Sequence, residues 1–302
     1  ANPSLAAHVA SSSPMSESVS RPLLMGGVAG SVAELASQPA NVIRTRMMVQ
    51  GVSASSNIAQ YRNLSHAIRM VFMEGGYSSF FKGAPVTLMF TPLGRSLYIG
   101  GVEFSKATIG SGTAWKDFVA GTVGQLVGSL ACVPRDCIVE RCAINAQLKT
   151  QVGSCGSAGE AIQTMWRQEG LQGFYRAYLP HQLVWIPNCG IFWVVMGKLQ
   201  QLEKRNGISS TGLHADVFNS AISAGVAGWA TTPFDVVKTR VQVSAANSEL
   251  FDFRSPIDCV VKLLRREGMA ALFSGGLGRI CYCVPNYVIF IPLYEQFKRF
   301  NV

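Results

Sequence analysis

The sequence predicts an all-α membrane protein of three tandem repeats, each built from two long helices and one short amphipathic helix. The first observation is a proline that follows a Gly-rich apolar stretch and recurs at steps of 95 and 99 residues, at Pro39, Pro134 and Pro233. The second is a Glu-Gly pair that recurs at steps of 95 and 98 residues, at Glu74, Glu169 and Glu267. Two independent markers with one period indicate an internal repeat. The third is composition: only 14% of the residues are charged, against about 25% in soluble domains.

The chain divides into an extension and one domain. Residues 1–20 are rich in Ser and Ala and contain no Lys or Arg, which predicts a flexible N-terminal extension rather than a secretory signal. Residues 21–302 are predicted to form a single domain, because one such repeat cannot bury its apolar faces alone. The repeats are expected at about 21–108, 114–204 and 212–302.

The helices follow from the same pattern in each repeat. A long Gly-rich helix comes first, at 22–50, 116–148 and 214–243. Small residues let helix backbones approach closely in a membrane, and the proline kinks the helix by removing one backbone hydrogen bond. A short amphipathic segment of the interfacial kind comes next, at 63–73, 157–168 and 255–266. A second long helix closes each repeat, at 84–106, 178–203 and 276–299.

These elements amount to six transmembrane helices and three surface helices. No window offers the unbroken run of about 20 apolar residues that marks a simple spanning helix. Gly, Pro and isolated charges interrupt the apolar stretches. Such interruptions are tolerated at membrane depth where they face protein or a watery cavity. We therefore expect a helix bundle with a polar interior.

Several function classes are disfavoured by composition. The formal net charge is +9, but no basic stripe is interleaved with stacking aromatics, so we expect no nucleic acid partner. We predict no metal site, no catalytic residues and no enzyme, because no nucleophile, base and orienting group occur together. The cysteines are interpreted as small buried hydrophobes. Those in apolar helical stretches are Cys132, Cys137, Cys142, Cys189, Cys281 and Cys283.

Three charged motifs recur in register. After each proline the pattern is P-x-[D/E]-x-x-[K/R], whose acid and base lie on one helix face. Its positions are occupied by Asn41 and Arg44, by Asp136 and Val139, and by Asp235 and Lys238. Charges also close the second long helices, at Glu103, Lys106, Lys198, Glu295 and Lys298. An aromatic-basic-Gly step follows each Glu-Gly pair, as Phe81-Lys82-Gly83, Tyr175-Arg176-Ala177 and Phe273-Ser274-Gly275.

With these motifs in register, the chain resembles the mitochondrial carrier family over about residues 22–300. The resemblance implies six tilted helices around a pseudo-threefold axis of the mitochondrial inner membrane, with the short helices on the matrix side and both termini facing the intermembrane space. It implies alternating access to a central solute site through two salt-bridge gates. The charges after the prolines would form the matrix gate, and those at the ends of the second long helices the intermembrane-side gate. Cardiolipin, the lipid partner, would contact helix N-termini at Lys82, Gly83, Arg176, Ala177, Ser274 and Gly275.

The chain departs from the family's matrix-gate pattern at one matched pair. The resemblance implies the pairs Asp136–Lys238 and Asp235–Arg44, whereas the third pair is replaced by Asn41 and Val139. Loss of one partner would leave an uncompensated buried charge, and loss of both removes that cost. We therefore interpret the missing bridge as a tuned feature of the gate rather than as a sign that the gate has decayed.

The intermembrane-side gate has fewer complete charge pairs than the family pattern. Glu103 is expected to pair with Lys298, and Lys106 lacks an acid on the fourth long helix. Lys198 lies out of register toward Glu295. Partly hydrated pairs contribute about 1 kcal/mol each, so these losses would shift the balance between open and closed states.

The resemblance also implies where the solute contacts lie, 12 or 13 residues before the acid that ends each second long helix. Counting back from Glu103 and Glu295 gives Phe90, Thr91, Tyr282 and Cys283. The fourth long helix lacks the acid, but the same level falls near Val184 and Trp185, and Arg95, Asn188, Arg279 and Asn286 lie nearby. The belt is mostly apolar with few cations, so we expect a small amino acid or related carboxylate rather than a nucleotide, its carboxylate near Arg279 or Arg95. A weaker resemblance, carried by Ile186-Pro187-Asn188 and the altered gate pair, is to the branch that contains the branched-chain amino acid carrier.

Two function hypotheses follow. The first is a mitochondrial inner-membrane transporter of a small-molecule solute. The second is a carrier-fold accessory subunit of a larger inner-membrane, respiratory complex, with little or no transport. The thin gates and the N-terminal extension motivate the second hypothesis. Liposome uptake of a metabolite would favour the first, and co-purification with a respiratory complex the second.

Overall fold

A computed structural model of the chain describes residues 13–50, 61–110, 114–145, 158–205, 213–244 and 255–299. Within these ranges the secondary structure is helical, without a strand. The long helices are α2 (Ser13–Val49), α4 (Ala84–Ile109), α5 (Ala114–Asn145), α7 (Tyr178–Arg205), α8 (Leu213–Ala230) continued by α9 (Thr232–Ser244), and α11 (Gly276–Arg299). The short helices are α3 (Leu64–Gly75), α6 (Ala158–Tyr175) and α10 (Pro256–Arg266), and 3-10 segments η1 (Gly76–Phe81) and η2 (Met269–Phe273) follow α3 and α10.

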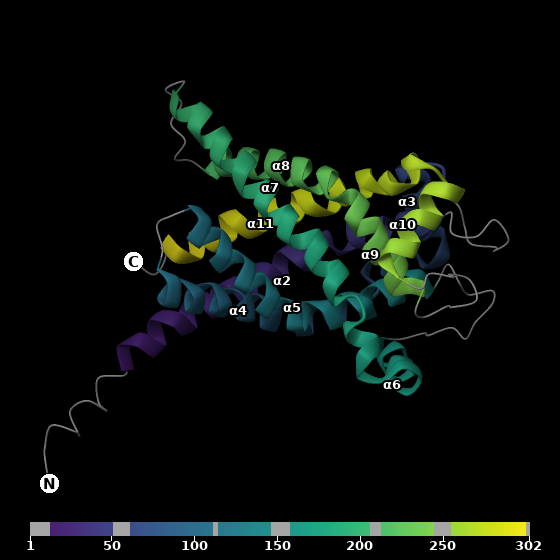
Figure 1. Cartoon of the computed structure of the whole chain (residues 1–302), viewed down its shortest axis with the longest axis horizontal. Helices are drawn as coiled ribbons and strands as arrows, with labels where there is room; N and C mark the ends of the chain where they lie inside the picture. Colours follow the sequence, from purple (N-terminus) through teal and green to yellow (C-terminus); the bar gives the residue numbers. More distant parts are fainter. Residues whose placement is uncertain are drawn as a thin grey trace, which may run out of the picture.

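The long helices form one elongated bundle, with the short helices at the end where α2, α5 and α9 finish (Figure 1). The predicted element order, long–short–long in three repeats, is confirmed for the described residues. The first helix begins at Ser13, before the predicted domain start, and residues 1–12 of the predicted extension lie outside the described ranges.

The prediction of one continuous helix over 214–243 is wrong. The backbone breaks at Thr231 between α8 and α9. Pro233 lies two residues beyond and has no N–H to continue the hydrogen-bond ladder. The hydroxyls of Thr231 and Thr232 donate to the carbonyls of Ala227 and Gly228 at 2.8 and 2.9 Å, in the last turn of α8.

The short helices are amphipathic, as the sequence predicts, and side-chain caps begin α3 and α10. Asn63 caps α3 by accepting a hydrogen bond from the His66 N–H at 2.8 Å, and Ser255 caps α10 by accepting from the Asp258 N–H at 3.1 Å. Such caps satisfy backbone donors that the first helical turn leaves free. The buried faces consist of Ala67 and Val71 in α3, Ala161 and Met165 in α6, and Cys259 and Leu263 in α10.

The Glu-Gly marker has a backbone explanation. Each short helix bends or ends at a glycine with positive φ: Gly76 at 65°, Gly170 at 61° and Gly268 at 80°. Residues with a Cβ rarely adopt this conformation. In the first repeat the second glycine of Glu74-Gly75-Gly76 makes the turn, one position later than the predicted Glu-Gly step.

Close helix packing explains part of the glycine pattern. A Cβ added to Gly124 of α5 would lie 2.7 Å from the Tyr98 carbonyl oxygen of α4, and one added to Gly128 would lie 3.0 Å from the Gly94 oxygen. The first distance is shorter than real Cβ contacts, and the second is tighter than most of them. The glycines therefore allow α4 and α5 to pack backbone against backbone, as small residues do between helices in membranes.

One helical segment in the described part of the chain, Met269–Tyr294, is long and apolar enough to cross a membrane by length and composition alone. Many large apolar side chains on the long helices are nevertheless exposed, among them Phe104, Trp115, Phe118, Leu183, Trp193 and Phe218.

Candidate functional site

A buried group of charges joins α2, α5 and α9 where the three prolines lie. We call it the charged ring, and it consists of Arg44, Asp136, Glu140, Asp235 and Lys238. Arg44 Nη1 is 3.0 Å from Asp235 Oδ2. Lys238 Nζ is 3.0 Å from Asp136 Oδ2. The structure thus brings together both ion pairs that the resemblance implies.

The proline motif places these side chains. In each repeat the charged positions follow the proline by two and five residues, so they share the helix face that points to the bundle axis. Glu140 of the ring falls outside this spacing, and sequence reasoning missed it. The motif expects a base at position 139, where the chain has Val139. The available signal was the acid at the next position, Glu140.

The altered pair is not joined by a polar contact in the described part of the chain. Val139 is buried in a cluster with Val86, Ile138 and Met165, and a Cβ on Gly83 would lie 3.2 Å from it. The side-chain oxygen of Asn41 is buried without a hydrogen-bond partner among the described residues. Val139 therefore packs as a hydrophobic residue.

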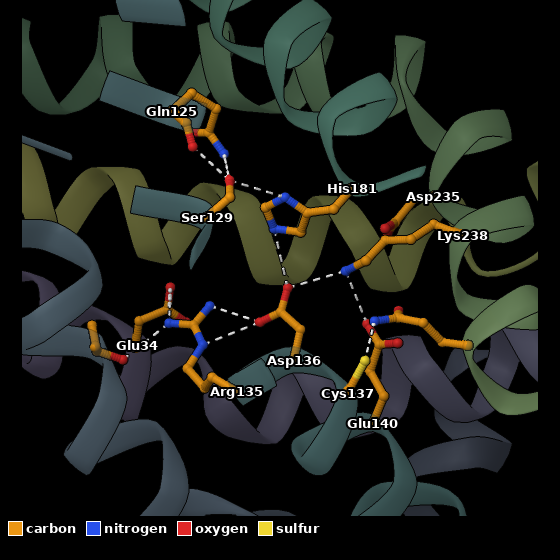
Figure 2. Close-up of polar contacts among 12 residues, drawn as sticks. Glu34, Gln125, Ser129, Arg135, Asp136, Cys137, Glu140, His181, Asp235 and Lys238 are labelled. Carbon is orange, nitrogen blue, oxygen red and sulfur yellow. Dashed lines mark hydrogen bonds and ion pairs between the residues drawn. The ribbon is translucent and has the colours of Figure 1, made fainter. Parts of the chain in front are cut away.

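Two further arginines extend the charged ring toward the middle of the bundle. Arg135 of α5 donates to Asp136 Oδ1 from Nε at 3.1 Å and from Nη2 at 2.8 Å. Arg279 of α11 contacts Asp235 Oδ2 through Nη1. Figure 2 shows His181 Nε2 of α7 pointing at the same Asp136, at 3.4 Å. Each ring aspartate therefore serves more than one cation.

A second set of ion pairs lies beside the ring, and we call it the outer arginine pairs. These are Arg46–Glu74 at 2.7 Å, Arg141–Glu169 at 2.7 Å and Arg240–Glu267 at 2.6 Å. Each arginine stands seven residues after its proline, and each glutamate belongs to the Glu-Gly marker. The sequence reasoning used those glutamates only as markers, although the constant offset was a usable signal.

Two of the outer arginines also bind the next repeat around the bundle. Arg46 Nε donates to the Ala143 carbonyl of α5 at 2.8 Å. Arg240 Nε donates to the Met48 carbonyl of α2 at 3.0 Å. Carbonyls in the last turn of a helix have no partner within that helix, and these donors supply one.

A central cluster of Glu34, Arg95, Arg135 and Tyr282 lies among α2, α4, α5 and α11. The Tyr282 hydroxyl donates to Glu34 Oε2 at 3.0 Å. Glu34 Oε1 is 3.6 Å from Arg135 Nη1 and 3.7 Å from Arg95 Nη2. Sequence reasoning missed Glu34 and Arg135. The signal for Glu34 was a single acid inside the first Gly-rich apolar stretch.

Several of the predicted polar contacts for solute are hydrogen-bonded within the protein. Thr91 Oγ1 accepts from Arg135 Nη1 at 3.0 Å. Thr231 Oγ1 accepts from Arg279 Nη2 at 2.9 Å and from Asn188 Nδ2 at 3.1 Å. The Nδ2 of Asn286 is buried without a hydrogen-bond partner among the described residues.

The predicted apolar contacts for solute lie in different parts of the bundle. Tyr282 and Cys283 form a buried cluster with Trp185 packed against it, so α7 and α11 meet at this level. Val184 is fully buried. Phe90 instead packs against the cluster that joins α5 and α6, and the structure does not place it with the charged side chains.

Comparison with known proteins accounts for this threefold arrangement. The sequence profile of the mitochondrial carrier protein family matches residues 16–113, 110–206 and 209–302. This chain belongs to the mitochondrial carrier family. Members of this family are transporters and not enzymes, and the predicted absence of enzymatic function is confirmed at that level.

Several carriers are similar along most of their length. Mitochondrial substrate carrier family protein E of Dictyostelium discoideum is 29% identical over 91% of this chain and 94% of its own length. Mitoferrin-1 of Homo sapiens is 27% identical over 95% and 85%. Solute carrier family 25 member 44 of Mus musculus is 26% identical over 87% and 85%. The differing names leave the solute of this carrier open.

At the other end of the carrier, the predicted gate charges are sparse. Glu103 Oε1 and Lys106 Nζ are 3.9 Å apart within α4, and both side chains are exposed. Lys198 is exposed on α7. The side chains of Glu295 and Lys298 lie outside the described part of the carrier, so the pair Glu103–Lys298 stays a prediction.

The predicted lipid positions lie at helix N-termini. Gly83 and Gly275, with φ of 82° and 77°, directly precede α4 and the turn into α11, and buried Ala177 precedes α7. Arg176 is exposed. The Lys82 carbonyl accepts a hydrogen bond from Gln38 Nε2 at 2.9 Å, and the Ser274 N–H donates to the Ala271 carbonyl at 3.1 Å. Cardiolipin contact at these positions stays a prediction.

The cysteines of the described residues make no disulfide, and no group of three or more His, Cys, Asp or Glu among these residues is placed to hold a metal ion. Cys137, Cys259 and Cys283 are buried, as the sequence analysis expects. Cys281 is exposed, and Cys132, Cys142 and Cys189 are half-buried.

Cys259 of α10 is expected to resist thiol reagents in the folded carrier. Burial raises the pKa of its thiol to about 11, so the reactive thiolate is a small fraction at neutral pH. We expect labelling of Cys259 by a maleimide at pH 7.5 only after unfolding, as measured by mass spectrometry of digested protein. Rapid labelling of the native carrier at this site would contradict the packing of α10 against α9.

Proposed function

We propose that this carrier spans the mitochondrial inner membrane with six helical rods and moves a small amino acid or related carboxylate by alternating access. The rods are α2, α4, α5, α7, α8 with α9, and α11. Exposed apolar side chains on their outer faces support contact with lipid. The charges that interrupt their apolar stretches are buried in the bundle, where intramembrane charges are tolerated.

The charged ring is the matrix gate in this proposal. Its ion pairs link α2, α5 and α9 at one end of the bundle, and side chains of this gate are almost fully buried. At the opposite end the described charges Glu103 and Lys106 are exposed and pair only within one helix. This asymmetry supports a state that is closed at the ring and accessible from the other end.

The central cluster is the solute site in this proposal, and Glu34 beside Arg95 is the observation that carries it. Arg279 and Arg135 each form an ion pair with a ring aspartate. The side chain of Arg95 is 29% exposed and lies 3.7 Å from Glu34. A loosely held cation is the one that a solute carboxylate can bind without breaking a gate pair. Of the two arginines that the sequence suggested, Arg95 is therefore the proposed carboxylate anchor.

Glu34 supplies the complementary charge. An acid next to Arg95 suits the ammonium group of an α-amino acid, because the two ends of a zwitterion need opposite charges. The buried belt of Trp185, Tyr282 and Cys283 lies near this acid through the Tyr282 hydroxyl. It suits a small apolar side chain. The resemblance to the branch that contains the branched-chain amino acid carrier points the same way.

The test is uptake by liposomes that contain the purified carrier and an internal amino acid pool. We expect uptake of labelled leucine, and loss of at least about thirtyfold in Arg95→Gln, which corresponds to about 2 kcal/mol for removing one partner of a partly buried charge pair. Arg167→Gln, an exposed arginine of α6, is the matched control and should transport normally. Normal leucine uptake by Arg95→Gln would remove Arg95 as the anchor.

Glu34→Gln separates amino acids from other carboxylates. We expect it to lose leucine uptake and to keep uptake of the corresponding 2-oxo acid, which has no ammonium group. Equal loss of both solutes would argue against an amine site at Glu34. No uptake of any amino acid, oxo acid or nucleotide by the parent protein would favour the accessory-subunit alternative.

Lipid and orientation complete the proposal. Cardiolipin phosphates are proposed to bind at the N-termini of α4, α7 and α11, where free N–H groups and the helix dipole attract anions. The short helices are proposed to face the matrix, and both chain ends the intermembrane space. The family to which the chain belongs supports these assignments.

A further inference from the structure

Glu140 occupies an unusual position in the charged ring. It is on α5, one residue after Val139, and is 2% exposed. Its Oε1 is 3.2 Å from Lys238 Nζ and 3.8 Å from Arg44 Nη2. Figure 2 shows it next to Lys238, on the side of that side chain away from His181. One carboxylate oxygen thus faces the basic side chains of both neighbouring helices.

We propose that Glu140 is a third acid of the gate and replaces the missing Asn41–Val139 pair. This rests on the proposed function of the ring as the matrix gate. The missing bridge would join the first long helix, α2, to the third, α5. Arg44 belongs to α2 and Glu140 to α5, so their contact joins the same two helices. The polarity is reversed: the base is now on α2 and the acid on α5.

The reversed bridge also explains why Val139 can be apolar. A base at position 139 would add a fifth cation to the four that already contact ring acids, Arg44, Arg135, Lys238 and Arg279. The valine instead fills the apolar cluster beside Gly83. The acid at the next position lowers the net positive charge of the ring. It thereby reduces the repulsion among these cations.

The energetics indicate a role beyond packing. Glu140 Oε2 is buried without a hydrogen-bond partner among the described residues. Buried polar atoms are usually satisfied in native structures, and an apolar side chain would avoid this cost. A carboxylate at this position is accounted for by its contacts with Lys238 and Arg44. Without Glu140, Lys238 would pair only with Asp136 and Arg44 only with Asp235 in the described part of the chain. These two aspartates also pair with Arg135 and Arg279.

The experiment measures gate opening directly, without any solute. Spin labels are placed at Met73→Cys on α3 and Ile257→Cys on α10, two exposed positions on the short helices. The eight native cysteines are replaced by alanine. Pulsed dipolar EPR then reports the distance between the labels. We expect Glu140→Gln to raise the ratio of long-distance to short-distance molecules about tenfold over the parent.

Glu169→Gln is the matched control. Glu169 is also a largely buried carboxylate, and it pairs at 2.7 Å with Arg141, the residue next to Glu140. It lies outside the charged ring. We expect this variant to lose thermal stability while keeping the parental distance distribution. An equal shift in both variants, or no shift in Glu140→Gln, would overturn the proposal.

Glu140→Asp keeps the test decisive if Glu140→Gln does not fold. Aspartate retains the charge but is one methylene shorter, so its oxygens lie farther from Lys238 and Arg44. We expect a shift in the same direction but smaller, and an unchanged distribution would overturn the proposal. Because no solute is added, a positive result here together with failed leucine uptake would count against the solute site alone.

Discussion

Asp235→Asn is expected to lower the free energy of unfolding by about 3–5 kcal/mol, the range for breaking a buried ion pair by removing one partner. Asp235 is 1% exposed and is the shared partner of Arg44 and Arg279, both of them buried. Asparagine has the same shape but leaves two guanidinium groups without their counter-charge. Thermal unfolding of the purified protein in detergent should show the loss as a fall in Tm.

Asp258→Asn is the control for this prediction. Asp258 of α10 pairs with Lys262 at 2.8 Å, with both side chains partly exposed, and such helix-surface pairs contribute well below 1 kcal/mol. We therefore expect almost no change in Tm, provided that asparagine leaves the cap at Ser255 intact. If Asp235→Asn were as stable as this control, the two arginines would have to be solvated in the folded protein.

Arg240→Met is expected to have a similar effect, about 3–5 kcal/mol, for a different reason. The side chain is fully buried and bonds to Glu267 through Nη1 at 2.6 Å and Nη2 at 3.0 Å. It also donates to the carbonyls of Met48 and Gln50, each at 3.0 Å. Methionine fills comparable volume but supplies no donor, so Glu267 and two carbonyls lose their partner.

The other outer arginines give a graded comparison. Arg46 bonds to Glu74 and to one carbonyl, that of Ala143. For Arg141 the described polar contacts are with Glu169. We expect the loss of Tm to decrease from Arg240→Met to Arg46→Met to Arg141→Met. An inverted order would mean that the carbonyl bonds between repeats contribute little.

Much of this architecture could be predicted because it repeats. The period of the prolines located the first long helix of each repeat, and the offsets of two and five residues located Arg44, Asp136, Asp235 and Lys238. The break at Thr231 could not be predicted, because Pro134 has an equivalent place in the sequence but lies inside the continuous helix α5. The outcome depends on local packing as well as on the proline.

Three of the residues that sequence reasoning missed are out of register. Glu34, Arg135 and Glu140 have no charged counterpart at the same position in each repeat, so a search based on symmetry passes over them. Arg279 was identified but given a solute-binding role. Its contact with Asp235 crosses from α11 to α9, and no spacing within one repeat reveals it.

The pairing of Arg44 with Asp235 has a consequence for how the chain folds. The two residues are separated by 191 positions, so the first repeat cannot satisfy its own arginine. Closing so long a loop is slow, because chain entropy must be lost before the contact forms. Until the third repeat is inserted, Arg44 has no Asp235 to neutralise it. A chain truncated after the second repeat should therefore be a substrate for quality-control proteases, and not a smaller version of the whole protein.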